Sequence, residues 1–140
     1  MFEVQPVRSK ELQSQIAALL GCEFRSDTYA FFAGELGPDC TTVTSVIALC
    51  QFTYTPERAD IVTLSFAPGC EHDEAVVILV RTVMNFVYRA GIPVIGFDKN
   101  AAEDKYIRAL GFRAVDGAYE IDLKKFYISP CGYGKENSGQ

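Results

Sequence analysis

The sequence predicts a single domain in which a mixed sheet carries packed helices, an α+β or α/β architecture. Short apolar runs with strand periodicity alternate with helical patterns in the order β-α-β-β-β-α-β-α-β-β. Turn sequences join the middle runs and favour antiparallel hairpins, whereas helical patterns between the later runs indicate crossovers. The length of 140 residues fits one domain of ordinary size. The chain is therefore long enough to bury a core of its own.

The first predicted elements are a strand over Phe2–Val7 and a helix that begins after Ser9 and extends to about Leu20. Ser9 has the side chain of an N-cap residue, and Gly21 supplies a C-terminal stop. Four residues at i, i+4, i+7 and i+8 predict the apolar face of this helix: Leu12, Ile16, Leu19 and Leu20.

Three β-rich runs follow, over Tyr29–Leu36, Val43–Tyr54 and Ile61–Phe66. Gly37–Asp39 and Thr55–Arg58 have the composition of turns and connect these runs. The middle of the sheet is therefore expected to be an antiparallel meander.

The second long helix is predicted over Asp73–Ala90, and its apolar residues lie on most sides, which indicates that it is largely buried. A short buried strand is expected over 93–97. Asn100 then opens a third helix, with Glu103 three residues later in the spacing of a capping box.

Two closing strands, Phe112–Val115 and Ala118–Leu123, flank an Asp116–Gly117 turn. The domain is predicted to span residues 1–127. Residues 128–140 are rich in glycine, serine and polar residues and are expected to form a flexible C-terminal tail.

Composition and charge exclude several classes of function. The net charge is −5 and no basic run occurs, so binding to nucleic acid or to an anionic membrane surface is not expected. No apolar run approaches the roughly 18 residues of a membrane span. Five cysteines without a CxxC pair, and a single histidine, predict no metal site. The odd number of cysteines and the lack of a signal peptide favour a cytoplasmic protein with reduced thiols.

The order of elements, with three local matches, resembles the GNAT family of acyl-CoA N-acyltransferases over about residues 2–126. The first match is Ala109-Leu110-Gly111-Phe112, which is similar to the sequence that closes the last helix of the family. The second is the strand–loop–helix unit over 61–90 with Pro68 in its loop, and the third is Asn100 after the fifth strand.

This resemblance implies a GNAT-like, three-layer fold: a mixed, mostly antiparallel sheet with helices on both faces. It implies transfer of an acyl group from acetyl-CoA to a primary amine of a small molecule or peptide. It places the co-substrate on one set of residues: Leu64, Ser65, Phe66, Ala67, Glu71, His72, Asp73, Glu74, Ala75 and Asn100. Tyr106 is the implied general acid, and Phe52 and Tyr54 are the expected lining of the acceptor site.

Two positions depart from the family pattern. The loop that holds the pyrophosphate has its basic or amide position at Glu71 and its small positions at Glu74 and Val76. Two like charges about 5 Å apart repel by about 3 kcal/mol at an effective dielectric constant near 20, so these carboxylates oppose phosphate binding. The family tyrosine falls on Ile107, and Tyr106 is one position early, which rotates it by about 100° on a helix.

Alternatives to the acyltransferase remain open. A non-catalytic GNAT-like module that has lost coenzyme A would serve as a binding domain or as a homodimer through a strand edge. A thiol-dependent enzyme would use Cys70 with His72 near a helix N-terminus, where a thiol pKa is lowered. Three carboxylates at strand ends, Glu57, Asp60 and Asp98, are either proton acceptors for the acceptor amine or solvated turn residues.

Overall fold

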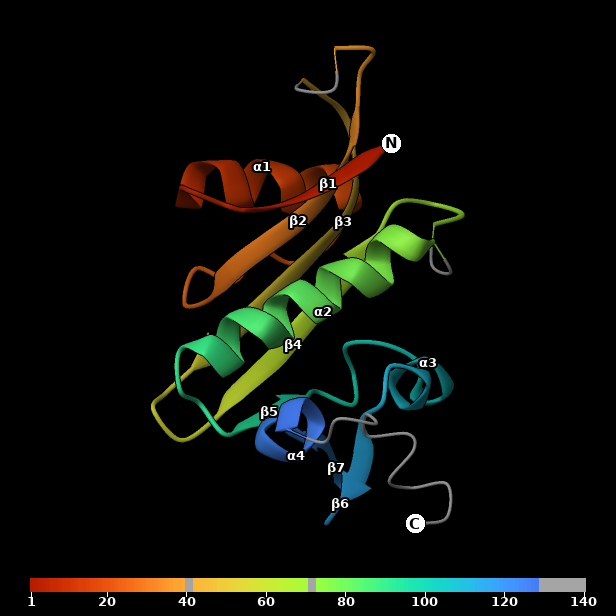
Figure 1. The fold of residues 1–140 in the computed structure, drawn as a ribbon. Coiled ribbons are helices and arrows are strands. Elements are labelled where there is room, and N and C mark those ends of the chain that lie inside the picture. The colour runs from red at the N-terminus through yellow and green to blue at the C-terminus, as the bar shows by residue number, and fades with distance from the viewer. Residues whose placement is uncertain (40–41, 71–72, 129–140) are drawn as a thin grey trace.

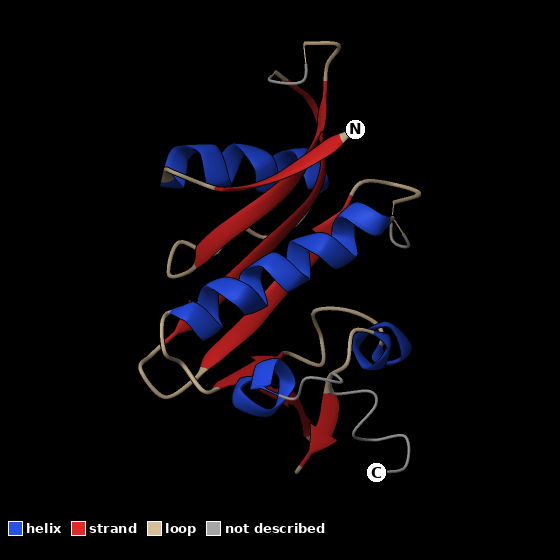
Figure 2. Cartoon of the chain, in the orientation of Figure 1, coloured by secondary structure: helices blue, strands red, loops and turns tan. Residues whose placement is uncertain are grey.

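The structure is a computed structural model that describes residues 1–39, 42–70 and 73–128. Its elements alternate along the chain as Figures 1 and 2 show. In order they are β1 (Phe2–Pro6), α1 (Lys10–Leu20), β2 (Tyr29–Leu36), β3 (Val43–Tyr54), β4 (Ala59–Phe66), α2 (Glu74–Arg89), β5 (Val94–Phe97), α3 (Asp104–Ala109), β6 (Arg113–Val115), β7 (Ala118–Asp122) and α4 (Leu123–Ile128).

All seven strands form one sheet in the order β1-β2-β3-β4-β5-β7-β6. Every neighbouring pair is antiparallel except β4 and β5, which are parallel because α2 crosses over between them. The predicted mixed, mostly antiparallel sheet is confirmed. The long strands β2, β3 and β4 form one half of the sheet, and the short strands β5, β7 and β6 form the other (Figure 2).

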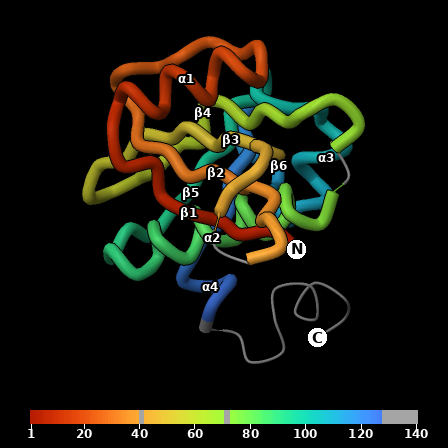
Figure 3. The backbone as a smooth tube through the Cα atoms, turned by 90° about the horizontal axis from the view of Figure 1, so that it is seen from above, coloured from red at the N-terminus to blue at the C-terminus, as the bar shows by residue number. Residues whose placement is uncertain are grey.

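Helices cover both faces of the sheet. Seen from above, α1 lies on one side of the strands, and α2 and α4 lie on the other (Figure 3). The core is largest beneath α2, where its buried side chains meet apolar residues of β3, β4, β5 and β7. A smaller cluster lies beneath α1, around Ile16, Ala17, Phe32 and Leu49.

The sequence sets the ends of α1 as expected, but not its buried face. Ser9 caps the first turn by accepting a hydrogen bond from the Leu12 amide at 3.1 Å, and Gly21 ends the helix with φ of 70°. Leu12 and Leu19, however, are 37% and 75% exposed. The buried residues are instead Gln13, Ile16 and Ala17, so the prediction of an apolar face through Leu12 and Leu19 is wrong. The face is rotated because buried Gln13 has hydrogen-bonding partners below it.

The start of α3 and the presence of α4 also differ from the prediction. Helix α3 begins at Asp104 after Glu103, which makes no side-chain cap, so the capping box from Asn100 does not form. Residues 123–128 form α4, which was not predicted. The Asp116–Gly117 turn is confirmed, with positive φ at both residues, as a tight hairpin between β6 and β7 requires. Residues 129–140, most of the predicted tail, lie outside the described residues.

Candidate functional site

The two parallel strands in the middle of the sheet separate along their length. Three residue pairs join β4 to β5, Ala59–Ile61 to Ile95–Phe97, and the Asp98 amide then donates to the Ile61 carbonyl at 2.9 Å. Strand β5 ends at Phe97, whereas β4 continues to Phe66. Within the described residues, the edge of β4 from Val62 onward is therefore not paired with β5.

A β-bulge marks the same point of β4. Phe52 of β3 is opposite Ile61, but Gln51 is opposite Thr63, so Val62 is an additional residue without a partner in β3. A bulge bends and twists the strand that carries it. Because the bulge directly follows the last β4–β5 pair, it turns the free half of β4 away from β5 and opens the junction.

Tyr106 of α3 lies against the free half of β4. Its ring meets the Phe66 ring edge-on at 6.2 Å, and it packs against the core cluster beneath α2. Burial raises the pKa of Tyr106 to about 12, and the neighbouring Cys50 thiol adds to the rise. The phenol therefore keeps its proton at neutral pH.

The residues predicted to hold the co-substrate along β4 have different environments. Leu64 is buried, whereas Ser65 and Phe66 are partly exposed. The Ala67 amide donates to the Ile47 carbonyl of β3 at 2.8 Å, so this N–H group is already used within the sheet. Backbone recognition on the free edge is thus confined to residues before Ala67.

The N-terminus of α2 carries negative charge. Asp73 caps the helix through its carboxylate, which accepts from the Ala75 amide at 2.9 Å, and Glu74 is exposed in the first turn. Ala75 is buried beneath the turn. Glu71 and His72, also predicted to contact the co-substrate, lie outside the described residues. The carboxylates of Asp73 and Glu74 oppose the binding of an anion at this helix N-terminus.

Several other predicted site residues lie away from the junction or have local roles. Asn100 is exposed, and its amide donates to the Asp98 carboxylate at 2.9 Å. Phe52 is fully buried, and Tyr54 packs on it and on Phe86 of α2. Both rings face the core beneath α2, and the residue between them, Thr53, faces the other side of the sheet. Cys70 is partly exposed in the loop before α2.

A pocket of about 450 Å³ lies beside the junction of β4 and β5, and we call it the β4–β5 pocket. Its charged lining residues are Arg25, Arg58, Asp60, Asp98 and Lys99. Its uncharged lining residues are Thr53, Val62, Phe97, Gly117 and Ala118. The bulge residue Val62 and the last β5 residue Phe97 belong to this wall, so the pocket reaches the point where the strands separate. Two of the three strand-end carboxylates considered above, Asp60 and Asp98, are in it.

A chain of charged groups crosses the sheet at the base of this pocket. Arg58 donates to Asp60 at 3.0 Å and to Glu120 of β7 at 2.7 Å, and these carboxylates raise the pKa of Arg58, Glu120 more than Asp60. The guanidinium passes over Gly96 of β5, where a Cβ atom would collide with it. Sequence reasoning missed this bridge, because Arg58 and Asp60 lie at the start of β4 and Glu120 lies in β7, far away in the sequence.

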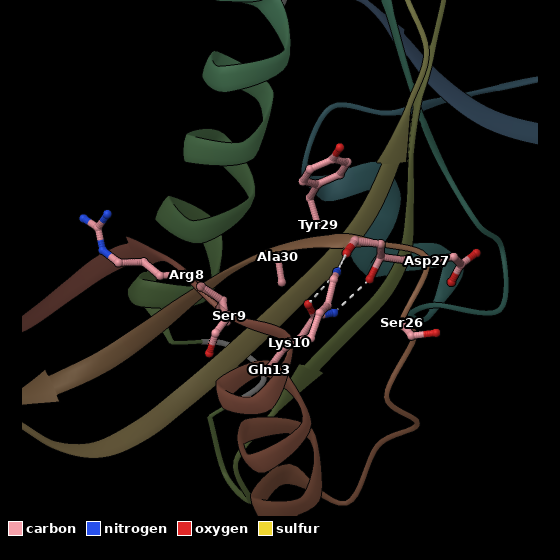
Figure 4. A pocket seen from close by; sticks show the side chains of 10 residues that line it. Arg8, Ser9, Lys10, Gln13, Ser26, Asp27, Tyr29 and Ala30 are labelled. Carbon is pink, nitrogen blue, oxygen red and sulfur yellow. Dashed lines mark hydrogen bonds between the residues drawn. The ribbon is translucent and has the colours of Figure 1, made fainter.

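A second pocket of about 370 Å³, the α1 pocket, lies at the start of α1 (Figure 4). It is lined by residues 7–10 and 13 around the start of α1 and by residues 26–30 around the start of β2, among them Arg8, Lys10, Gln13, Asp27 and Tyr29. The Lys10 ammonium donates to the Gln13 side chain at 3.2 Å and to the Thr28 carbonyl, whereas Arg8 points away from them (Figure 4). The cation nearest to buried Gln13 is thus already held by protein groups.

No helix among residues 1–39, 42–70 and 73–128 is long and apolar enough to cross a membrane. No group of three side chains suited to a metal ion occurs in that same part of the chain.

Comparison with known proteins gives structural matches alone: no family model and no curated protein matches the chain by sequence. A crystal structure from Desulfovibrio desulfuricans, assigned to the GNAT family of acetyltransferases, superposes with a TM-score of 0.65. It is 14% identical, and the match covers 88% of this chain and 99% of that one.

Two enzymes of this fold with stated substrates also match. The ribosomal-protein-S18-alanine N-acetyltransferase of Escherichia coli has a TM-score of 0.58 at 13% identity, over 86% of this chain and 89% of that one. The N-acetylglutamate synthase of Neisseria gonorrhoeae, solved with coenzyme A and N-acetylglutamate, has a TM-score of 0.62 at 10% identity. That match covers 86% of this chain and 34% of the longer enzyme. At these identities the likeness establishes the fold.

Proposed function

Because the chain has the fold of the GNAT acyltransferases, we propose that it transfers an acyl group from acetyl-CoA to a primary amine. The observation that carries this proposal is the separation of β4 from β5 at the Val62 bulge. One side of this opening is faced by Tyr106, and the other by the charged β4–β5 pocket. A donor and an acceptor can therefore approach one opening from two sides of the sheet.

The residues divide the reaction between these two sides. Bound acetyl-CoA supplies an activated thioester carbonyl next to the free edge of β4. The acceptor amine, held in the β4–β5 pocket, forms the new C–N bond as the C–S bond breaks. Asp98, at the end of β5, takes the proton that the amine loses, directly or through a water molecule. Tyr106 gives its phenolic proton to the departing thiolate, and the proton lost by the amine restores the phenol after the products leave.

The free thiols support a reducing, cytoplasmic location for this reaction. Cys22, Cys50 and Cys70 form no disulfide in the described structure. Reduced thiols are usual in the cytoplasm. Metabolic acyl thioesters and amines are substrates of the same compartment.

A second candidate function is a non-catalytic module of the same fold. The carboxylates of Asp73 and Glu74 favour it, because they occupy the helix N-terminus where an anion would otherwise be attracted. Binding of the donor decides between the two functions.

The deciding experiment is thermal unfolding with acetyl-CoA and with S-acetylpantetheine, which lacks the diphosphate. A ligand at about 100 times its dissociation constant stabilises by about 2.7 kcal/mol. For a domain of this size, that raises Tm by roughly 5 to 10 °C. The Asp73→Asn/Glu74→Gln variant keeps a capping side chain and loses two charges. It should bind acetyl-CoA about tenfold more tightly, with S-acetylpantetheine unchanged.

Catalysis is then measured as thiol release in the presence of amines. Tyr106→Phe should lower kcat by about 100-fold and leave the affinity for acetyl-CoA unchanged. If neither thioester raises Tm of the wild type or of the charge variant at millimolar concentration, the acyltransferase is excluded and the non-catalytic module remains.

A further inference from the structure

The loop between α1 and β2, residues 21–28, lies on a network of buried polar side chains. Gln13, Thr28 and Gln51 are 2%, 1% and 0% exposed. The side-chain amide of Gln13 donates to the side-chain oxygen of Gln51 at 2.8 Å and to the Thr28 hydroxyl at 2.9 Å. Buried polar groups are costly unless they are paired, and these are paired with one another and with the loop backbone.

The network fixes one loop residue, Arg25, by both of its backbone groups. The Arg25 amide donates to Gln51 Oε1 at 3.0 Å. The Arg25 carbonyl accepts from the Thr28 hydroxyl at 2.7 Å and from Gln13 Nε2 at 3.2 Å. Gln51 also donates to the Glu23 carbonyl at 2.9 Å, which holds the residue two positions earlier. The backbone of Arg25 is therefore held in place from within the protein.

Arg25 is one of the residues that line the β4–β5 pocket. Its ion pair is with Asp27, at 3.3 Å, and the two side chains are 35% and 62% exposed. Asp27 lines the α1 pocket on the other side of the loop. Both carboxylate oxygens of Asp27 accept from this guanidinium, at 3.3 Å each, and the pair is exposed enough for a carboxylate that enters the β4–β5 pocket to take the place of Asp27.

The other charges of the pocket favour a ligand with both signs. Arg58 is already engaged by Asp60 and Glu120. Lys99 makes no ion pair within the part of the chain that the structure describes, and it lines the pocket with Asp98. A polyamine would meet Arg25, Arg58 and Lys99 and be repelled. An ammonium group beside Asp98 and a carboxylate beside Arg25 would both be matched, and 450 Å³ has room for a molecule the size of an amino acid.

We propose that the acceptor is an amine that also bears a carboxylate, and that Arg25 selects it by binding that carboxylate. This inference rests on the proposed function and names its substrate class. The planar guanidinium can donate two parallel hydrogen bonds to a carboxylate, which fixes the direction from which the amine approaches the junction.

The test uses pairs of amines that differ by one carboxylate: lysine with cadaverine, ornithine with putrescine, and phenylalanine with phenethylamine. With saturating acetyl-CoA, the wild type should show, in at least one of these pairs, a kcat/KM for the amino acid at least tenfold higher than for the amine without the carboxylate. Arg25→Gln should lower kcat/KM for that amino acid by about 30-fold through KM, the loss of one charge-assisted pair. Arg25→Gln should change kcat/KM for the amine without the carboxylate by less than threefold.

Arg8→Gln is the matched control, because Arg8 is an exposed cation that lines the α1 pocket. It should leave both values unchanged. Arg25→Lys keeps the charge without the planar fork and should fall between the wild type and Arg25→Gln. Tm of each variant within about 2 °C of the wild type shows that the fold is intact, as expected for surface substitutions.

Equilibrium binding of the same amines to the protein without acetyl-CoA separates this inference from the proposed function. Binding of an amino acid that weakens in Arg25→Gln supports the inference even if no acyl transfer occurs. Acyl transfer with equal preference for both members of every pair, or binding that is indifferent to Arg25, overturns the inference and leaves the acyltransferase in place. Failure of every carboxylated amine to bind at 10 mM overturns it as well.

Discussion

The two faces of the sheet are built differently. On the face covered by α2, every buried helix residue is apolar: Ala75, Val76, Leu79, Val80, Val83, Met84 and Val87. On the face covered by α1, a glutamine is buried beside Ile16 and Ala17, and it meets a second buried glutamine, Gln51, from the sheet. Apolar packing is non-directional and supplies stability. Paired hydrogen bonds are directional, so the α1 face holds a loop in one position.

The two faces also differ in how much of the sheet they cover. Helices α2, α3 and α4 pack over the core that extends from β3 to β7. Helix α1 contacts β3, and no helix within the described residues covers β4, β5 and β7 on that side of the sheet (Figure 3). The charged bridge of Arg58 and the β4–β5 pocket occupy this uncovered area. The face that contributes less apolar core is thus the face that can admit a polar ligand.

The largest loss of stability is expected from a cavity on the face of the sheet covered by α2. Leu79→Ala removes a fully buried side chain of α2 and should lower the free energy of unfolding by about 3 kcal/mol. Leu19→Ala on α1 is the control, because Leu19 is 75% exposed and should change stability by less than about 0.5 kcal/mol. Urea unfolding measures both. Equal losses would show that α1 buries more apolar surface than the structure indicates.

A smaller effect is expected from the polar network on the other face. Gln51→Leu leaves the Gln13 side-chain amide, the Arg25 amide and the Glu23 carbonyl without this partner, and should cost about 2 kcal/mol. The matched control is Gln15→Leu, at an exposed position of α1, with a change within about 0.5 kcal/mol. Hydrogen exchange of the amides in 21–28 should also accelerate in Gln51→Leu. A stability unchanged by this substitution would contradict the role given to the network.

The smallest loss of stability is expected at Gly96 of β5, beneath the Arg58 guanidinium. Gly96→Ala places a methyl group where the Arg58 guanidinium crosses β5. The guanidinium is at the end of a flexible, partly exposed side chain and can move, so the loss should be at most about 1 kcal/mol. The added methyl group would also meet the Asp60 carboxylate, which Arg58 no longer holds in an Arg58→Ala background, so the same substitution should cost less there. A double-mutant cycle in urea measures the coupling, and an additive result would show that the bridge does not constrain Gly96.

Much of the fold follows from the sequence because its signals are local. Ser9 and Gly21 set the ends of α1, and the Asp116–Gly117 pair sets the last hairpin. The apolar run that became α2 predicted a buried helix, and the order of elements was confirmed except for α4. Errors occurred where a local pattern competed with a distant contact. The Asn100–Glu103 spacing resembles a cap, but the Asn100 amide binds the Asp98 carboxylate and α3 starts later.

The candidate site could be predicted in part. Tyr106 faces the free half of β4 although its position on the helix differs from the family pattern, because packing against Phe66 determines its direction. The acidic N-terminus of α2 is visible in the sequence as Asp73 and Glu74, and the structure shows Asp73 as the cap. Phe52 and Tyr54 were expected at an acceptor site, yet alternation along β3 turns both toward the core, and Thr53 lines the pocket.

The kinds and order of the elements follow from local sequence, since periodicity, caps and turns act between residues close in the chain. The place where β4 and β5 separate depends on the folded sheet, because a bulge at Val62 is defined by pairing with β3. The tertiary structure also decides which polar residues act together. Arg58, Asp60 and Glu120 meet across three strands, and Gln13 and Gln51 meet between a helix and the sheet, where burial makes each hydrogen bond necessary.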